Sequence, residues 1–239
     1  MRRGRRNARE RLVSITFDDG FRSAAEAATP ILERFCYAAT FYLVTGWVKP
    51  ERARISEAYN VGRCHGDWPF WQNVSLRGHE IGSHGFSHMN ARGKVAAVAP
   101  WLLTRDIRRS FEDIRRQVPH DEYTISMPWN ASSAISQRAA SAYFSGCVAG
   151  DSAVRYNNLS DLDRYSVQAW APESSHAQED YRIAIEGIPD RGWLVFQFHS
   201  FDQEGWEPIT TSHLAWMCEL LKRSDVCVTT VRDALQRAK

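Results

Sequence analysis

Ser14-Ile15-Thr16-Phe17-Asp18-Asp19-Gly20 is a largely apolar, strand-like run that ends in two adjacent carboxylates and a glycine. Adjacent acids repel each other, and a carboxylate that is buried without a partner costs free energy. A cation held between these acids and further ligands removes that cost. The run therefore predicts a fold that brings other metal-ligating side chains to the end of this strand.

Strand-like and helix-like segments alternate along the chain, which predicts a parallel α/β layout. The expected strands are residues 12–17, 38–44, 79–83, 123–127, 144–149, 165–170, 192–198 and 226–230, and the expected helices are 23–35, 68–76, 101–118, 133–143, 176–188, 214–221 and 232–238. In a parallel sheet or barrel the carboxyl ends of the strands open on one face. The groups that follow four strands should therefore share one cleft: Asp18 and Asp19, His84 through His88, Pro128 and Trp129, and His199.

Two imidazoles lie four residues apart in His84-Gly85-Phe86-Ser87-His88, and from a tight turn both reach one ion. Alone, such a pair is more often incidental, and an acidic turn after a strand is common. Together, one carboxylate and two histidines form a three-ligand set with an open position for water, typical of catalytic zinc. Zinc is the expected metal, with cobalt, nickel or manganese as alternatives. The remaining aspartate can then act as a base.

Composition limits the remaining function classes. The 239 residues suffice for one sizeable core, and the net charge of +2 predicts no nucleic-acid partner. The basic residues concentrate in residues 1–11, expected to be a flexible, solvated terminus rather than a site for nucleic acid or anionic lipid. No apolar run approaches the ~20 residues of a membrane span or follows the start as a secretion signal requires, so a cytoplasmic location is expected. Five dispersed cysteines favour reduced thiols, with Cys36, Cys218 and Cys227 expected in the core.

The runs 16–20 (TFDDG) and 82–88 (GSHGFSH) resemble the first two motifs of the polysaccharide deacetylases, the NodB-homology domains of carbohydrate esterase family 4. The segment 194–199 (LVFQFH) is similar to the late motif that carries a histidine. The resemblance spans roughly residues 12–230 and so implies a single domain at 12–239. It implies a distorted (β/α) barrel with parallel strands. It also implies metal-dependent removal of an acyl group from an N-acyl amino sugar.

Carried over residue by residue, the resemblance assigns Asp19, His84 and His88 to the metal, Asp18 to the general base and His199 to the general acid. The stretch Ser126-Met127-Pro128-Trp129-Asn130 corresponds to an arginine-and-proline motif that forms one cleft wall, where the Trp129 N–H would help to hold the developing oxyanion. Ser126 stands where many members have an arginine paired with the base, and Asn130 replaces a common glycine. A clear copy of the fourth motif is missing, with Asp151 and Asp163 as candidates. These departures bear on substrate class more than on metal binding.

The long loop from Thr45 to Asp67 lacks a clear period, and such loops are usually functional or mobile. Its Tyr59, Asn60, His65 and Asp67, with the following Trp68, either line the substrate cleft or serve packing and solvation. Trp68, Trp71 and Trp206 are expected either to stack on a sugar ring or to pack in the core. The sequence leaves three functions open: a deacetylase of amino sugars or polysaccharides, a hydrolase of a non-sugar amide, and an inactive glycan-binding barrel. Oligomeric state and the choice between polymer and monomer are not specified.

Overall fold

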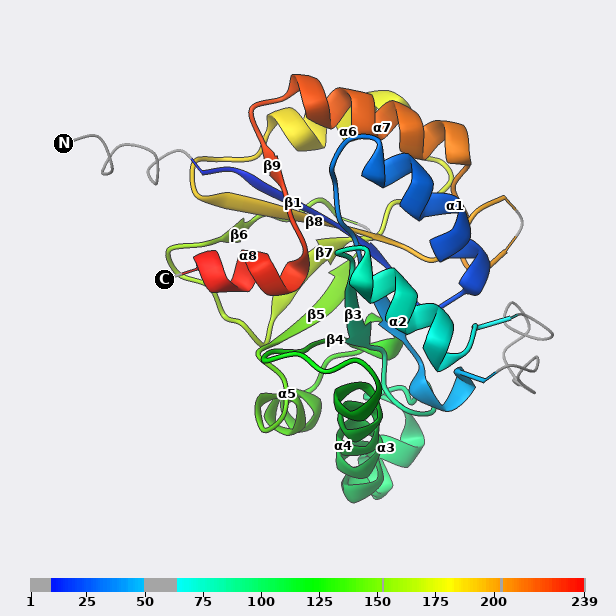
Figure 1. Cartoon of the computed structure of the whole chain (residues 1–239). Helices are drawn as coiled ribbons and strands as arrows, with labels where there is room; N and C mark the ends of the chain where they lie inside the picture. Colours follow the sequence, from blue (N-terminus) through cyan, green and yellow to red (C-terminus); the bar gives the residue numbers. More distant parts are fainter. Residues whose placement is uncertain (1–9, 50–63, 152, 203, 239) are drawn as a thin grey trace.

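The computed structural model describes residues 10–49, 64–151, 153–202 and 204–238. Within these ranges seven parallel strands close a barrel, and most of the helices cover its outside (Figure 1). The order around the barrel is β1, β2, β3, β4, β5, β7 and β8. Closure is made by β8 and β1, which pair in register from Leu12 opposite Trp193 to Phe17 opposite Phe198. The predicted parallel (β/α) barrel is confirmed.

The barrel strands are β1 (Leu12–Phe17), β2 (Thr40–Leu43), β3 (Glu80–Ser83), β4 (Thr124–Ser126), β5 (Gly146–Asp151), β7 (Val167–Trp170) and β8 (Gly192–Phe198). Two short strands extend the sheet at the amino-terminal ends of β1 and β8. Strand β9 (Cys227–Val228) runs parallel to β1, and β6 (Asn157–Asn158) runs antiparallel to β8. The helices are α1 (Arg22–Glu33), α2 (Trp68–Leu76), α3 (Lys94–Val98), α4 (Pro100–Gln117), α5 (Ala134–Ser141), α6 (Gln178–Glu186), α7 (Thr211–Arg223) and α8 (Val231–Arg237). Single 3₁₀ turns are η2 (Thr45–Trp47) and η3 (Pro128–Asn130).

Alternate residues of β1 and β8 face opposite sides, as the twofold period of a strand requires. One set joins the large apolar cluster that packs against α1, α6 and α7: Val13, Ile15, Phe17, Leu194, Phe196 and Phe198. The other set points into the barrel, where Leu12, Trp193 and Val195 join a second cluster. Polar residues share this interior face: Ser14, Thr16 and Gln197 are all buried. Along β1 and β8 the interior face therefore changes from apolar to polar towards the carboxyl ends of the strands.

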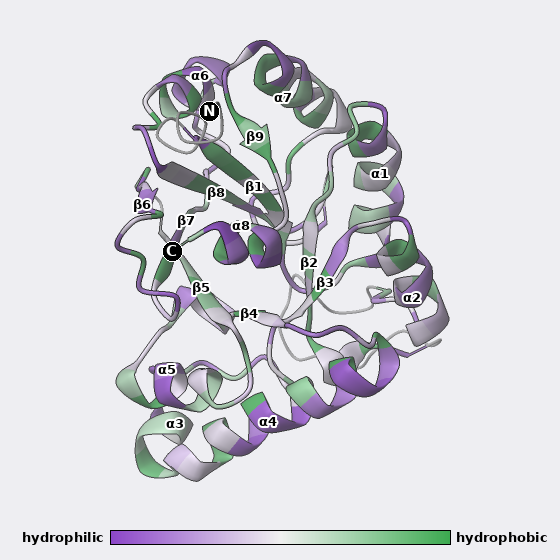
Figure 2. Cartoon of the chain, turned by 60° about the vertical axis from the view of Figure 1, so that its left-hand side comes forward, coloured by the Kyte–Doolittle hydropathy of each residue, from purple (hydrophilic) through white to green (hydrophobic). Residues whose placement is uncertain are grey.

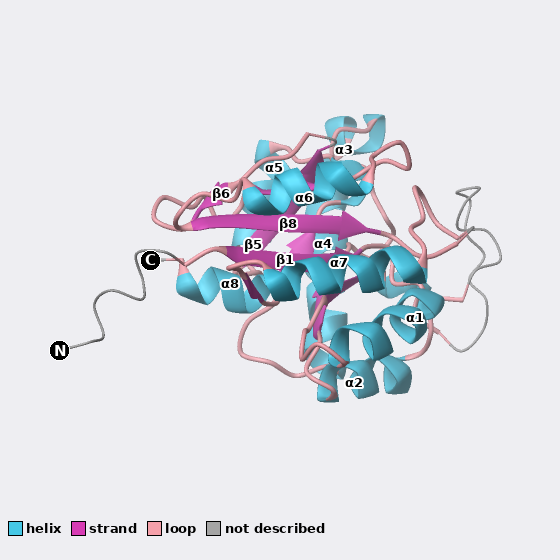
Figure 3. Ribbon diagram, turned by 90° about the horizontal axis from the view of Figure 1, so that it is seen from above, coloured by secondary structure: helices cyan, strands magenta, loops and turns pink. Residues whose placement is uncertain are grey.

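Helix α8 closes the barrel at the amino-terminal ends of the strands, behind the tails of the arrows in Figure 3. Its apolar residues Val231, Ala234 and Leu235 pack into the interior cluster. The first N–H groups of the helix donate to side chains at the starts of two strands, Thr40 Oγ1 at 3.1 Å and Glu80 Oε2 at 2.9 Å. Helix α8 thus covers this end, and the cavity lined by Asp18, Asp19 and His199 lies at the opposite end.

Helix α4 carries hydrophilic and hydrophobic residues on different sides (Figure 2). Its buried stripe consists of Leu103, Asp106, Ile107, Ser110 and Ile114. The polar members Asp106 and Ser110 face the end of β3. Asp106 contacts the loop that follows β3.

Several predicted features differ from the structure. Helix α1 begins at Arg22 after a fully buried Phe21, one residue before the predicted start. The short elements α3 and β6 were not predicted, and Cys36 and Cys227 are exposed rather than in the core. Residues 1–9 of the predicted flexible terminus and residues 50–63, with Tyr59 and Asn60, lie outside the described residues. Arg11 is held by the carbonyls of Ile185, Glu186 and Ile188. In the described ranges, every helix is too short or too polar to span a bilayer.

Candidate active site

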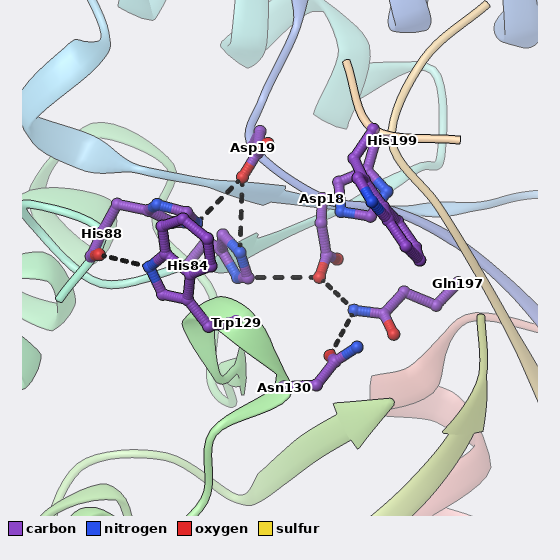
Figure 4. Close-up of a pocket in the computed structure, with 9 residues that line it drawn as sticks. Asp18, Asp19, His84, His88, Trp129, Asn130, Gln197 and His199 are labelled. Atoms are coloured by element: carbon purple, nitrogen blue, oxygen red, sulfur yellow. Dashed lines mark hydrogen bonds and ion pairs between the residues drawn. The ribbon is translucent and has the colours of Figure 1, made fainter. Parts of the chain in front are cut away.

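The two adjacent aspartates leave β1 through a sharp reversal of the backbone. Asp18 N–H still donates to the carbonyl of Phe198 at 2.8 Å, but Asp19 and Gly20 have φ values of 68° and 69°. Gly20 permits this turn, because a Cβ there would lie 2.9 Å from Leu43 Cδ2. The ring Nδ1 of His65 lies 3.0 Å from the Asp19 carbonyl oxygen and holds the turn from the other side. Both carboxylates consequently face the open end of the barrel (Figure 4).

The two histidines follow β3 in a loop that a helix holds in place. Asp106 of α4 accepts hydrogen bonds from the N–H groups of Phe86 and Ser87 at 2.9 and 3.0 Å. This contact fixes the residues between the histidines. The rings of His84 and His88 then lie side by side, with centroids 5.1 Å apart.

Asp19, His84 and His88 come together in a geometry that fits a metal ion. The Nε2 atoms of His84 and His88 lie 3.5 and 3.3 Å from Asp19 Oδ1, and one ligand atom from each residue falls within 4.8 Å of the others. His84 Nδ1 donates to the Ser126 carbonyl at 2.9 Å, which leaves Nε2 as the lone-pair atom. Both Asp19 carboxylate oxygens are buried without a hydrogen-bond partner among the described residues. Orphaned buried oxygens beside two imidazole nitrogens match the donor set of a divalent cation.

The protonation states of Asp19 and His84 also suit metal binding. Burial alone would raise the pKa of Asp19, but close contact with His88 and the charges of His199, His88 and His84 outweigh it and hold that pKa well below its usual range. Burial and the neighbouring His88 lower the pKa of His84 to about 3. A metal binds ionised carboxylates and neutral imidazoles, so no proton has to leave these two residues at neutral pH.

Asp18 is fully buried, and its two oxygens have different surroundings. Oδ2 accepts from Ser126 Oγ at 2.8 Å and from Gln197 Nε2 at 2.6 Å. Oδ1 has no hydrogen-bond partner among the described residues. Burial raises the pKa of Asp18 to about 6, although the charge of His199 and the two hydrogen bonds act in the opposite direction. The carboxyl group is therefore placed to exchange a proton near neutral pH.

A cavity of about 220 Å³ opens above these groups, and its lining comprises Asp18, Asp19, His84, His88, Trp129, Asn130, Gln197, His199 and Trp206. His199 is half-buried and packs edge-on against the Trp206 ring, with centroids 5.6 Å apart. Burial lowers the pKa of His199, and the carboxylates of Asp19 and Asp18 oppose that effect. Trp129 lies over His88 with centroids 5.2 Å apart and donates its Nε1–H to the His88 carbonyl.

The structure brings most of the predicted site residues to this cavity. Pro128 is buried and begins the η3 turn that presents Trp129, whose φ of 62° lies in the left-handed region. Asp67 and Trp68 do not line the cavity. Asp67 Oδ1 caps α2 by accepting from Phe70 N–H at 3.0 Å, and Trp68 packs against two apolar clusters. Their contact with substrate stays a prediction.

The fourth-motif candidates do not support His199 where they are described. Asp163 is exposed and accepts from the N–H of Tyr165 at 2.9 Å, in a local turn. The side chain of Asp151 lies outside the described part of the chain.

Sequence reasoning missed three polar residues of the site. Gln197 and Asn130 line the cavity, and Asp106 organises the histidine loop. A signal existed for Gln197, because an amide two residues before His199 in an otherwise apolar strand shares its face with the barrel interior. Asp106 lies at helical spacing from Leu103 and Ser110, inside the buried stripe. Asn130 was placed in the predicted cleft wall as a replacement for glycine, but its hydrogen bonds to Gly150 and Gln197 were not predicted.

Comparison with known proteins places the chain in a family. The sequence profile described as Polysaccharide deacetylase matches residues 5–143, more than half of the 239 residues. No curated protein matches the chain in sequence.

Solved structures share the fold at low sequence identity. The carbohydrate esterase 4 domain of a multidomain xylanase from the hindgut metagenome of Trinervitermes trinervoides is 17% identical with a TM-score of 0.61, over 95% of this chain and 91% of that one. A family 4 acetyl xylan esterase from Clostridium thermocellum, in complex with a cobalt ion, is 18% identical with a TM-score of 0.62, over 94% of this chain and 90% of that one. A family 4 pseudoenzyme from Bacillus anthracis is 14% identical with a TM-score of 0.63, over 95% of this chain and 66% of that one. The structural likeness establishes the distorted (β/α) barrel, and the sequence profile shows that the chain belongs to the polysaccharide deacetylase family.

Proposed function

We propose that this protein is a metal-dependent hydrolase that removes the acetyl group, or another acyl group, from the nitrogen of an amino sugar or polysaccharide. One observation carries the proposal. The buried, orphaned carboxylate of Asp19 faces the Nε2 atoms of His84 and His88, while Asp18 and His199 line the same cavity. Family membership supports hydrolysis of an acylated substrate.

Asp19, His84 and His88 are the residues that would hold the metal. A bound divalent ion supplies Lewis acidity towards the acyl oxygen and lowers the pKa of a water towards about 7. Zinc is the first choice for this donor set, with cobalt, nickel and manganese as alternatives. The cobalt ion in the Clostridium thermocellum esterase is consistent with that range.

Asp18 and His199 carry the proton transfers in this proposal. Asp18 takes a proton from the attacking water at Oδ1, the oxygen without a hydrogen bond among the described residues. The water oxygen forms the new bond to the acyl carbon, and the bond from that carbon to nitrogen breaks. His199 delivers a proton to the leaving nitrogen, which departs poorly as an anion. The products are acetate and a free amine, so atoms and protons balance.

Two tryptophans give the cavity walls that suit a sugar ring. Trp129 is 49% exposed and Trp206 is 41% exposed, although large aromatic side chains are usually buried. An indole offers a flat apolar face together with a polar N–H, a combination that suits a ring with both C–H and O–H groups. The backbone N–H of Trp129 is proposed to hold the developing oxyanion.

Acetate release from a panel of N-acetylated amino sugars and their oligomers tests the proposal. The chelated protein is expected to be inactive, and zinc, cobalt, nickel or manganese should restore release. Release that ignores chelation would contradict metal dependence. An Asp161→Asn variant, changed at a surface carboxylate outside the cavity lining, serves as the matched control and should behave like the wild type.

A second candidate is a barrel that binds a glycan without turning it over. It is favoured by one specific observation, namely that the fold is shared with a family 4 pseudoenzyme from Bacillus anthracis. Metal occupancy measured by elemental analysis, combined with no acetate release across the panel, would support this candidate over the hydrolase.

A further inference from the structure

A chain of hydrogen bonds runs from the backbone of β5 to the carboxylate of Asp18. Figure 4 shows its links from Asn130 through Gln197 to Asp18. Gly150 N–H donates to Asn130 Oδ1 at 2.9 Å, and Gln197 Nε2 donates to the same oxygen at 2.8 Å. Gln197 Nε2 also donates to Asp18 Oδ2 at 2.6 Å. Ser126 Oγ reaches that same carboxylate oxygen at 2.8 Å.

The direction of every bond in this chain follows from its first donor. A backbone N–H only donates, so Asn130 must present its carbonyl oxygen to Gly150. That oxygen only accepts, so Gln197 must turn its NH₂ group towards Asn130. An amide NH₂ carries two hydrogens, and the second one points at Asp18 Oδ2. The two side-chain amides therefore have only one consistent orientation.

The surrounding structure keeps space for this arrangement. A Cβ at Gly150 would lie 1.7 Å from Gln197 Oε1 and 2.7 Å from Asn130 Nδ2, so only glycine accommodates both amides. Asn130 has a φ of 50°, a conformation that asparagine tolerates better than most residues. Gln197 is 3% exposed, and solvent therefore competes little for its amide hydrogens.

We propose that Gln197 and Asn130, together with Ser126, are positioning residues that hold Asp18 Oδ2 as a hydrogen-bond acceptor and leave Oδ1 as the atom that receives a proton. His84 Nδ1 also lies 3.7 Å from Asp18 Oδ2, but it donates to the Ser126 carbonyl. Within the described residues, no lysine or arginine hydrogen-bonds or ion-pairs with Asp18, and the groups that donate to Oδ2 are the neutral side chains of Ser126 and Gln197. A proton on Oδ2 would meet the hydrogens of two donors. This inference rests on the proposed function, because it concerns the base of that reaction.

The Gln197→Met variant tests the donor. It keeps side-chain length but loses the hydrogen bond to a charged group, so kcat should fall about 10- to 100-fold with KM nearly unchanged. Metal occupancy should stay at the wild-type level, because Asp19, His84 and His88 are untouched. The matched control is Gln168→Met on β7, whose amide donates to Ser166 alone among the described residues and which should keep the wild-type kcat. A Gln197→Met enzyme with wild-type kcat would overturn the proposal.

The acceptor role of Asn130 is tested by a pair of variants that both tolerate its positive φ. Asn130→Gly removes the oxygen, whereas Asn130→Asp keeps an oxygen in its place. We expect Asn130→Asp to retain about tenfold more kcat than Asn130→Gly. A purely structural role would not produce this rescue by the conservative variant. Equal kcat values, or a more active glycine variant, would remove Asn130 from the chain of bonds.

A turnover-free readout separates this inference from the proposed function. In protein labelled with ¹⁵N-glutamine, the Gln197 side-chain amide hydrogens should exchange slowly with solvent, and Asn130→Gly should shift and accelerate that resonance more than Asn130→Asp does. A Gln197 amide that exchanges as fast as an exposed one would overturn the inference. Wild-type protein that releases no acetate would instead remove the proposed function, and the amide signal would still decide whether Gln197 donates to Asp18.

Discussion

Two buried carboxylate clusters lie at opposite ends of the same barrel, and they differ in how completely their oxygens are bound. At the closed end, Glu80 accepts from Thr124 Oγ1, from Thr40 Oγ1 at 2.8 Å and from Arg232 N–H at 2.9 Å. At the open end, neither oxygen of Asp19 has a hydrogen bond among the described residues. The two carboxylates are thus similarly buried, but Glu80 has hydrogen bonds to its oxygens and Asp19 has none among the described residues.

This difference in hydrogen bonding distinguishes a carboxylate that stabilises the fold from one in the candidate active site. A buried polar group without a partner costs free energy, so a fold retains one only where something else compensates. Glu80 is compensated by the chain itself, since it joins β2, β4 and α8 at the barrel floor. Asp19 has no hydrogen bond among the described residues and lies instead beside His84 and His88, as the proposed metal site requires.

The largest expected effect is on catalysis at the open end. Asp18→Asn keeps the shape of the side chain but removes the base, so kcat should fall by about 10²- to 10⁴-fold. Metal content by elemental analysis should remain at the wild-type level, because Asp18 is not among the proposed ligands. Turnover retained by this variant would remove Asp18 from its role as base.

Metal binding should stabilise the protein through the open end alone. A ligand that binds only the native state at about 1,000 times its Kd adds about 4 kcal/mol to the free energy of unfolding. Zinc should therefore raise the Tm of the chelated wild type, and His84→Ala should abolish the rise. Glu80→Gln, changed at the closed end, is the control and should retain it. A full metal-induced rise in His84→Ala would refute that ligand assignment.

At the closed end, Glu80→Ala should destabilise the fold by about 3 kcal/mol. The reason is that it removes the acceptor for the Arg232 N–H and two threonine hydroxyls and leaves a cavity under α8. Asp19→Asn in chelated protein should cost less stability than this, because neither Asp19 oxygen has a hydrogen bond to lose among the described residues. Urea unfolding of both variants measures the contrast. Equal losses would show that the two clusters are not different in kind.

The sequence reveals the open end better than the closed end. Five site residues could be predicted from the sequence, because each follows a strand and carries an ionisable side chain: Asp18, Asp19, His84, His88 and His199. Elements with strong signals also have the predicted bounds: α2 is capped by Asp67 and followed by Gly78, and β8 is an apolar run interrupted by Gln197. The elements that were missed, α3 and β6, are too short to show a period.

Other features depend on contacts that no local pattern encodes. Asn130 and Gln197 are 67 residues apart in sequence and meet because η3 and β8 line the same cavity of the folded barrel. The exposure of Cys36 and Cys227 is similarly set by where the chain turns: Cys36 ends the α1 turn at a φ of 58°, and Cys227 lies on a strand at the sheet's margin. Residue type alone predicted burial for both.

The space kept by Gly150 offers a smaller test at the open end. In Gly150→Ala the new methyl group must displace the Gln197 amide, so kcat should fall about tenfold without a change at Asp18 itself. A double-mutant cycle with Gln197→Ala is the control. The combined variant should be no slower than Gln197→Ala alone, because both changes break the same bond. Additive losses would mean that Gly150 acts through another contact.

The smallest effect concerns how the closed end responds to pH. Burial raises the pKa of Glu80 above its usual value, only partly offset by the hydrogen bonds from Arg232 N–H, Thr124 and Thr40. The native state therefore binds a proton that the unfolded chain has already released. Stability from this group is complete below the unfolded pKa and declines as pH rises through the folded one.

Glu80→Gln cannot titrate, so it isolates this contribution from all other groups. The urea midpoint of the wild type, measured relative to Glu80→Gln, should rise as the pH is lowered from neutral towards the usual carboxyl range. A difference that does not change with pH would mean that the three donors stabilise the ionised carboxylate as well as water does. In that case the closed end would resemble the open end in electrostatics, and only the presence of donors would distinguish them.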